Sequence, residues 1–237
     1  MSMLLPAFIA VLLLVIYQVQ QQRKKNKIKR WANSLNLPQH SQVFNELFCN
    51  TDGFALSKLA REKQDAFAYT YGEIEFLSFI ALIGLTHPDE NTRFYDLGSG
   101  VGKAAIACAL VFDLKQSCGI ELFEPLHQEA LTQKKRLARV PGYESKAERI
   151  QFIHNDFLQE DLGPATLLFI NATTFIGDLW KQLSEKLGEV AGGATVITIS
   201  KKLSSNAFKV IRTTQVNMSW GIVTAYIQEH QYQAEDY

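Results

Sequence analysis

The sequence feature that most constrains this chain is a glycine-rich stretch between an apolar run and a run of small, apolar residues. The stretch reads Asp96-Leu97-Gly98-Ser99-Gly100-Val101-Gly102-Lys103. It follows Phe94-Tyr95 and precedes Ala104–Leu110, which predicts a strand, a turn and a helix. Alternate glycines let a ligand lie against bare backbone, and the free N–H groups at the helix start point toward the turn. This arrangement is typical of a nucleotide-binding loop in an α/β sheet.

Spacing separates three kinds of nucleotide-binding loop. A phosphate-binding Walker loop requires Gly at the position of Leu97 and Ser or Thr at the position of Ala104. A dinucleotide fingerprint requires a third Gly where Lys103 stands. The pattern that fits is Asp-x-Gly-x-Gly-x-Gly, in which the chain resembles the class I S-adenosylmethionine (SAM) methyltransferases. The alternative is a glycine turn in an ordinary α/β domain.

The length and composition of the chain limit the folds and functions that it can have. Its 237 residues suffice for one α/β domain with an appendage, and 47% of them are hydrophobic, enough for a sizeable core. The 24 basic and 24 acidic residues balance, so net charge gives no strong signal for nucleic-acid binding. Three cysteines and five histidines lack metal-binding spacing, so we predict no metal site and no disulfide framework.

The N-terminal segment predicts a membrane anchor. A run from Met3 to Val19 is almost wholly apolar, at the short end of the roughly 17–25 residues that span a bilayer. Six basic residues follow between Arg23 and Arg30, and none precedes the run. By the positive-inside tendency, we expect a single-pass membrane protein with a cytoplasmic catalytic domain. The alternatives are a buried core helix and an interfacial helix.

These features divide the chain into three expected parts. Residues 1–22 form the transmembrane anchor, residues 23–68 a basic juxtamembrane segment with a helical region, and residues 69–237 the catalytic domain. Apolar residues at helical spacing predict a helix from Phe54 to Phe67 in the second part.

Polar residues end two strands that are expected after the glycine-rich stretch. Glu121 ends the strand over 117–121, where an α/β nucleotide site places a carboxylate for the ribose hydroxyls. Asp156 and Phe157 follow the strand over 150–154. This pair suits adenine, because the carboxylate accepts a hydrogen bond from the exocyclic amine and the ring supplies an apolar face. A turn Asp beside a core Phe is the alternative.

The strand over 166–170 is expected to lie beside the first strand of the sheet. Asn171 follows it and therefore stands where the group that receives the methyl would be handled. A turn followed by a fifth strand over 191–200 and an antiparallel pair over 212–220 and 222–229 complete the expected sheet.

Tyr71-Gly72-Glu73 precedes a helix that is expected over 75–85. Gly72 permits a tight bend, and Glu73 can present its carboxylate to a cationic ligand such as the amino group of a methionine moiety. A helix start with an acid in its first turn is the alternative.

The order of these motifs resembles a narrower family. Tyr-Gly-Glu, the glycine-rich stretch and the strands ending at Glu121, Asp156 and Asn171 are followed by Gly192-Gly193 and Ser219-Trp220. This order is similar to the Dot-one (disruptor of telomeric silencing) histone-lysine methyltransferases, which methylate a core lysine of histone H3 without a SET domain. The resemblance implies a class I SAM-methyltransferase fold, α/β and Rossmann-like. Its sheet would be seven-stranded and mostly parallel, with helices on both faces.

The resemblance also implies the cofactor SAM and a set of site residues. Asn171 would line the channel for the acceptor lysine, with Tyr71 and Phe175 as its walls. Since the sulfonium is already an activated methyl donor, the protein would supply alignment and a channel that favours the neutral amine. The implied cofactor-binding residues are Tyr71, Gly72, Glu73, Asp96, Gly98, Ser99, Gly100, Gly102, Lys103, Glu121, Asp156, Phe157 and Asn171.

Three departures from the family pattern affect the expected substrate. Ala172 replaces a second asparagine, Lys103 stands where the family usually has glutamine, and the chain ends in an acidic rather than a basic segment. We therefore expect a membrane-anchored protein-lysine methyltransferase. A membrane protein is a candidate acceptor, and a histone is not favoured. The alternatives are a small-molecule or lipid methyltransferase and a non-catalytic SAM-binding scaffold.

Overall fold

The computed structural model describes residues 4–62 and 66–231. The chain divides between Gln42 and Val43 into two compact units. The first unit consists of α1 (Leu4–Ser34) and the start of α2 (Leu37–Phe48), and the second contains all the remaining elements.

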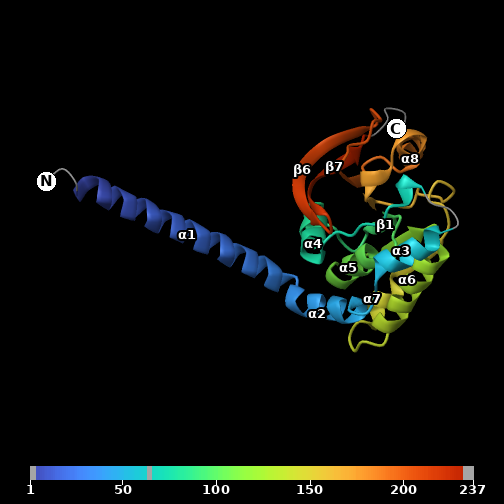
Figure 1. Ribbon diagram of the computed structural model, residues 1–237, viewed down its shortest axis with the longest axis horizontal. Coiled ribbons are helices and arrows are strands. Elements are labelled where there is room, and N and C mark those ends of the chain that lie inside the picture. The colour runs from blue at the N-terminus through green and yellow to red at the C-terminus, as the bar shows by residue number, and fades with distance from the viewer. Residues whose placement is uncertain (1–3, 63–65, 232–237) are drawn as a thin grey trace. The chain divides into compact units, whose positions relative to one another are not determined.

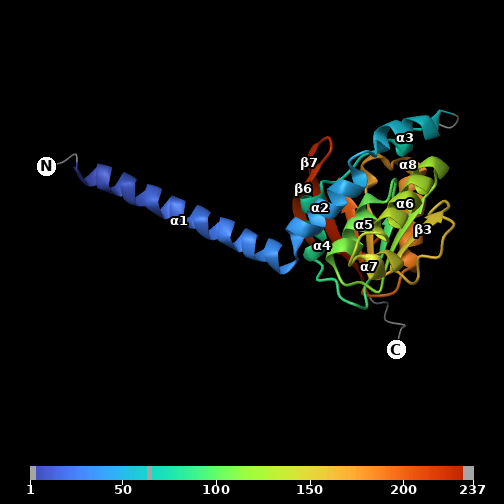
Figure 2. The same cartoon turned by 90° about the horizontal axis from the view of Figure 1, so that it is seen from below.

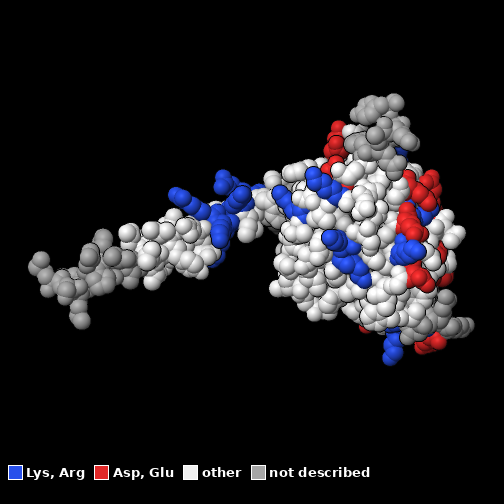
Figure 3. All heavy atoms as spheres, turned by 90° about the horizontal axis from the view of Figure 1, so that it is seen from above, with Lys and Arg blue, Asp and Glu red and all other residues white. Residues whose placement is uncertain are grey.

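The predicted membrane anchor is not supported. No helix among the described residues is long and apolar enough to cross a bilayer. The physical reason is that α1 continues without a break from its apolar residues into glutamines from Gln18 and then into basic residues from Arg23. Figure 3 shows these basic side chains gathered on α1. The prediction of a single-pass membrane protein with a cytoplasmic domain is therefore wrong. Residues 1–3 of the predicted anchor lie outside the described residues.

The second unit is built on one seven-stranded sheet (Figure 1). The order across the sheet is β3-β2-β1-β4-β5-β7-β6. Strands β1 to β5 are parallel, and β7 runs antiparallel between β5 and β6, which confirms the predicted mostly parallel sheet. The strands are β1 (Arg93–Leu97), β2 (Gln116–Glu121), β3 (Ile150–His154), β4 (Leu167–Ile170), β5 (Thr195–Ile199), β6 (Phe208–Met218) and β7 (Gly221–His230).

Helices cover both faces of this sheet, because strand side chains alternate between the faces. On one face, Phe79 of α4 packs edge-on against Phe94 of β1 and Phe169 of β4, with ring centroids 6.0 and 5.2 Å apart. On the other, Tyr95 shares a buried core with Leu183 of α8. Figure 2 shows α5, α6 and α7 beside the strands. The helices are α4 (Phe76–Gly84), α5 (Lys103–Val111), α6 (Glu124–Leu137), α7 (Glu144–Glu148) and α8 (Gly177–Lys186), with 3₁₀ turns η2 (Ala172–Thr174) and η3 (Leu187–Glu189).

The segment before the sheet differs from the sequence expectation. Helix α3 (Gly53–Arg61) is shorter than the helix predicted over Phe54–Phe67, and Phe67 begins a separate 3₁₀ turn, η1 (Phe67–Tyr69). The Asp52 carboxylate caps α3 by accepting a hydrogen bond from the Ala55 N–H, at 3.0 Å. Ahead of it, the Thr51 hydroxyl donates to Glu129 of α6 at 2.8 Å. These contacts hold the start of α3 against α6.

Strand register brings the predicted polar residues to one edge of the sheet. Asp96 of β1 is level with Gly119 of β2 and Phe169 of β4. The carboxyl ends of β1, β2 and β4 therefore lie side by side, and Glu121 and Asn171 are at those ends.

Gly102 packs the glycine-rich loop tightly against the sheet. It caps α5 in the left-handed region, with φ +82°. A Cβ at this position would lie 2.5 Å from the Phe152 ring of β3 and 3.0 Å from the Cβ of Ala130 of α6. Both the backbone conformation and the available space thus require glycine here.

We predict that Gly102→Ala lowers the free energy of unfolding by roughly 2–5 kcal/mol, because left-handed strain and a ring clash act together. Gly142→Ala is the matched control, since Gly142 has φ +83° with nothing within 4 Å of an added Cβ. The control should lose only about 1–2 kcal/mol. Urea unfolding measures both changes, and equal losses would contradict the packing argument.

Candidate functional site

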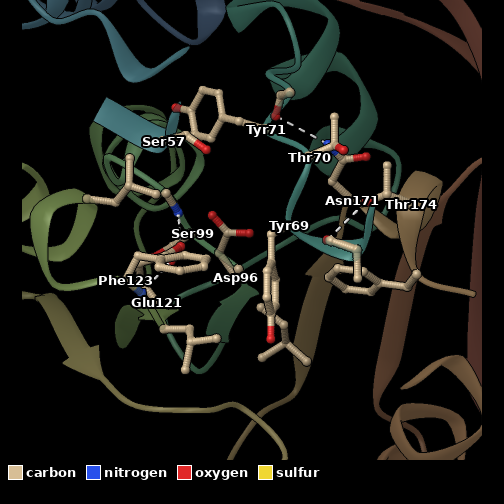
Figure 4. A pocket seen from close by; sticks show the side chains of 18 of the residues that line it. Ser57, Tyr69, Thr70, Tyr71, Asp96, Ser99, Glu121, Phe123, Asn171 and Thr174 are labelled. Atoms are coloured by element: carbon tan, nitrogen blue, oxygen red, sulfur yellow. Dashed lines mark hydrogen bonds between the residues drawn. The ribbon is translucent and has the colours of Figure 1, made fainter. Parts of the chain in front are cut away.

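A cavity of about 360 Å³ opens at the carboxyl ends of β1, β2 and β4 (Figure 4). It is walled by the glycine-rich loop, by η1 and the Tyr71–Glu73 segment, and by residues that follow β2, β3 and β4. Its size lies in the range of small-molecule sites. Among the residues that line it are Ser57, Tyr69, Thr70, Tyr71, Gly72, Glu73, Asp96, Gly98, Ser99, Gly100, Lys103, Glu121, Phe123, Asp156, Phe157, Asn171, Thr174 and Phe175.

Glu121 is held by the backbone around it. One carboxylate oxygen accepts a hydrogen bond from the Gly100 N–H at 2.7 Å, and the other accepts from the Phe123 N–H at 2.8 Å. Burial raises the pKa of the Glu121 carboxyl, and these N–H groups oppose the rise. The glycine loop and the end of β2 therefore fix this carboxylate at the cavity wall.

Asp96 is the second buried acid of the site. It is 4% exposed, and its side chain has no hydrogen-bonding partner within the described part of the chain. Burial, and next the charge of Glu121, raise the pKa of the Asp96 carboxyl to about 8. A buried acid without a protein partner is costly, and it suits a cavity whose ligand supplies the missing hydrogen bonds.

Tyr71, Glu73 and Lys103 form a polar cluster at another part of the cavity wall. The Tyr71 hydroxyl donates to one oxygen of Glu73 at 2.8 Å, and the Lys103 ammonium lies 2.6 Å from the other. Burial, and next the Glu73 charge, raise the pKa of Tyr71 well above its usual value, so it stays a hydrogen-bond donor. The Tyr71 ring lies so close to Gly100 that an added Cβ would be 2.6 Å from it.

The β6–β7 hairpin fixes the backbone that carries Glu73. The Ser219 N–H donates to the Glu73 carbonyl at 2.8 Å, and the Glu73 N–H donates to the Ser219 hydroxyl at 3.2 Å. Ile74 forms an isolated bridge with Met218, at the end of β6. A segment 146 residues later in the chain thus positions this carboxylate.

Asn171 follows β4 and is oriented by two further polar groups. Its amide donates to the Gly72 carbonyl at 3.2 Å, and its side-chain oxygen accepts from the Thr173 hydroxyl at 3.1 Å. Thr173 is in turn 2.8 Å from the Ser200 hydroxyl, and Ser200 has the unusual φ of +73°. Neither Thr173 nor Ser200 was predicted as part of the site, because no spacing rule connects the end of β4 with the loop after β5.

Aromatic side chains supply the apolar part of the cavity. Phe157 and Phe175 lie 5.6 Å apart between ring centroids. Tyr69 meets Phe123 edge-on at 5.1 Å, and both line the cavity. Neither Tyr69 nor Phe123 was predicted, although each lies two residues from a residue that was.

The structure brings together all but one of the predicted site residues. The exception is Gly102, which does not line the cavity and instead packs against Phe152. The described residues contain no group of His, Cys, Asp and Glu side chains that could hold a metal ion. Four acids, Glu73, Asp96, Glu121 and Asp156, lie around this cavity with backbone glycines and aromatic rings. This set of groups suits a cationic nucleoside with a polar tail.

A protein-family model described as the histone methylation protein DOT1 matches residues 55–235. Among similar proteins is the histone-lysine N-methyltransferase, H3 lysine-79 specific, of Caenorhabditis elegans. It is 27% identical over 173 residues, which are 64% of this chain and 18% of that protein. The Candida glabrata enzyme of the same name is 30% identical, over 60% of this chain and 23% of that protein. The chain thus spans less than a quarter of the length of these relatives.

A shorter relative matches over more of its own length. The protein-lysine N-methyltransferase of Saccharolobus islandicus is 27% identical over 137 residues, which are 57% of this chain and 80% of that protein.

Among solved structures, an RNA methyltransferase of Salinibacter ruber in complex with S-adenosyl-L-homocysteine has a TM-score of 0.52 at 22% identity. The match covers 67% of this chain and 94% of the chain in that structure. At this identity the match shows the fold, which is that of the class I SAM methyltransferases, as the sequence predicted. The family match covers most of the chain, and the chain therefore belongs to the family of the histone methylation protein DOT1.

Proposed function

We propose that the protein is a SAM-dependent methyltransferase that modifies a lysine side chain of a protein. The observation that carries this proposal is the cavity in which Glu73, Asp96 and Glu121 converge beside Asn171. SAM carries positive charge on its sulfonium and amino groups, so buried carboxylates complement it. Family membership supports the same cofactor.

The cofactor-binding roles follow from the contacts of each residue. Glu121, fixed by the glycine loop, would accept hydrogen bonds from the ribose hydroxyls, and Asp96 lies between β2 and β4 in the same wall. Asp156 and Phe157 would hold the adenine, with Phe157 backed by Phe175. When bound, SAM supplies an activated methyl group, and the protein's part is to align it with the acceptor.

The acceptor side of the site centres on Asn171. Its amide is held by Gly72 and Thr173, so it presents a fixed polar group beside the aromatic ring of Phe175. A lysine amine attacks only when neutral, and an apolar channel lowers its pKa from about 10.4. The contacts of Tyr71 with Glu73 and Gly100 favour a role on the cofactor side rather than as a channel wall.

The proposed acceptor is a lysine of a protein, and the proposal does not extend to which protein carries it. The short Saccharolobus islandicus relative, of which this chain covers 80%, is named a protein-lysine N-methyltransferase. The match covers 18% and 23% of the relatives named for histone H3, so their substrate is not proposed for this chain.

The proposal is tested by incubating the purified chain with tritium-labelled SAM and a protein extract of its source cells. Recombinant histone H3 and nucleosomes are assayed in parallel. We expect label in protein bands, and methyl-lysine after acid hydrolysis. Label found only in the lipid extract or in small molecules would contradict the proposed acceptor, and failure of the chain to bind S-adenosyl-L-homocysteine would contradict the cofactor assignment.

We predict that Asn171→Ala abolishes most methyl transfer while it leaves cofactor binding within about threefold, because the residue acts on the acceptor side. Calorimetry with S-adenosyl-L-homocysteine measures binding, and tritium incorporation measures transfer. Asn91→Ala, at an exposed position in the turn before β1, is the control and should change neither. Full transfer by the Asn171 variant would exclude it from the acceptor site.

We predict that Asp96→Asn becomes increasingly stabilising as the pH rises from about 4 to about 8. The folded-state pKa of Asp96 is about 8, above its ordinary value of 3.8. Between these values the folded state binds more protons than the unfolded state, so wild-type stability falls as pH rises. The Asn variant lacks this pH-dependent loss of stability, and thermal unfolding across the pH range measures the difference.

The same substitution should weaken S-adenosyl-L-homocysteine binding roughly tenfold or more.

Asp113→Asn is the control for the pH dependence. Asp113 is exposed and pairs with Arg149, which holds the pKa of its carboxyl below the usual value. Its replacement should cost little and should not become stabilising at high pH. A pH-independent effect of Asp96→Asn would show that Asp96 is ionised in the folded protein throughout this range.

A further inference from the structure

Each oxygen of the Glu73 carboxylate already has a partner within the chain. Lys103 occupies one oxygen at 2.6 Å and the Tyr71 hydroxyl occupies the other at 2.8 Å. The ion pair is largely shielded from water, since the side chains of Lys103 and Glu73 are 24% and 20% exposed. Both residues line the cavity. A ligand ammonium that pairs with Glu73 must therefore share this carboxylate with Lys103 or displace Lys103 from it.

The position of Lys103 is unusual for a cation. It is the first residue of α5, directly after the N-cap Gly102, where the helix dipole and free N–H groups favour negative charge. Lys103 is held there by Glu73 and by the Phe48 ring, whose centroid is 5.5 Å from the ammonium. If the Glu73 contact is given up, the ammonium and the helix N-terminus together form a site for an anion.

The proposed cofactor ends in an amino acid, which carries one ammonium and one carboxylate. The following inference rests on the proposed function. We propose that Lys103 and Glu73 together bind this zwitterionic tail, with one residue for each of its charges, and we call the pair the clamp. Glu73 exchanges the Lys103 ammonium for the ammonium of the ligand, and Lys103 pairs with the carboxylate of the ligand. Each charge of the resting ion pair thus finds a new partner.

This exchange makes Lys103 a residue that determines specificity. A ligand with the ammonium but without the carboxylate would displace Lys103 from Glu73 and leave it without a counter-ion in a partly buried site. A ligand that lacks the whole tail would leave the ion pair untouched. The cavity should therefore reject decarboxylated tails and accept amino-acid tails.

The test measures dissociation constants by calorimetry on the full chain and on Lys103→Gln, which keeps a polar side chain of similar length. Three probes are used. S-adenosyl-L-homocysteine has the whole tail, its decarboxylated analogue keeps only the amine, and 5′-methylthioadenosine has no amino-acid tail.

For the wild type we expect S-adenosyl-L-homocysteine to bind roughly tenfold or more tightly than the decarboxylated analogue. Lys103→Gln should weaken S-adenosyl-L-homocysteine roughly tenfold and should not weaken the decarboxylated analogue, so the preference collapses. Binding of 5′-methylthioadenosine should be unchanged, which also shows that the variant is folded.

Lys115→Gln is the matched control, because Lys115 is exposed just ahead of β2, at the opposite end of the strands from the cavity. It should leave all three dissociation constants unchanged. Equal weakening of both tailed probes by Lys103→Gln, or no change in S-adenosyl-L-homocysteine binding, would overturn the clamp while the proposed function stands. A wild-type chain that binds none of the three probes would overturn both.

Discussion

The site depends on the close contact between the glycine-rich loop and the end of β2. The Gly98 and Ser99 N–H groups both donate to the Ile120 carbonyl, at 2.9 and 3.0 Å, and the Gly100 N–H donates to Glu121. These bonds tie the loop after β1 to the neighbouring strand, and Gly102 lets it approach β3 and α6. The loop therefore both forms the cavity floor and fixes the acid beside it. A side chain at Gly102 would press on the Phe152 ring and separate the loop from β3.

The contact between the loop and β2 also buries two carboxyl groups, and burial of their charge is unfavourable for folding. Asp96 and Glu121 are both buried, each has a raised pKa, and the charge of Glu121 acts on Asp96. Backbone N–H groups compensate Glu121 but not Asp96. This asymmetry is typical of functional sites, in which stability is lost locally and is regained when a ligand binds. The hydrophobic core on both faces of the sheet supplies the stability that tolerates it.

Most of the sheet could be predicted because its strands are short, apolar and punctuated by glycine and acids. The strand over 150–154 agrees residue for residue with β3, and the acids at 96, 121 and 156 all line the cavity. The membrane anchor was predicted wrongly, because the apolar run was judged apart from the long, largely polar helix that continues it. Thr173 and Ser200 could not be predicted, since their contact joins loops that follow different strands.

The sequence by itself determined the fold class, the family and the segments that carry the site, because these depend on local spacing of glycines, acids and apolar residues. Only the tertiary structure decided how the charges pair. Glu73 lies 30 positions from Lys103 and is supported by Ser219, 146 positions away. Which cation reaches a carboxylate depends on the strand order and on the packing of the hairpin against the Tyr71–Glu73 segment. Spacing along the chain does not encode that proximity.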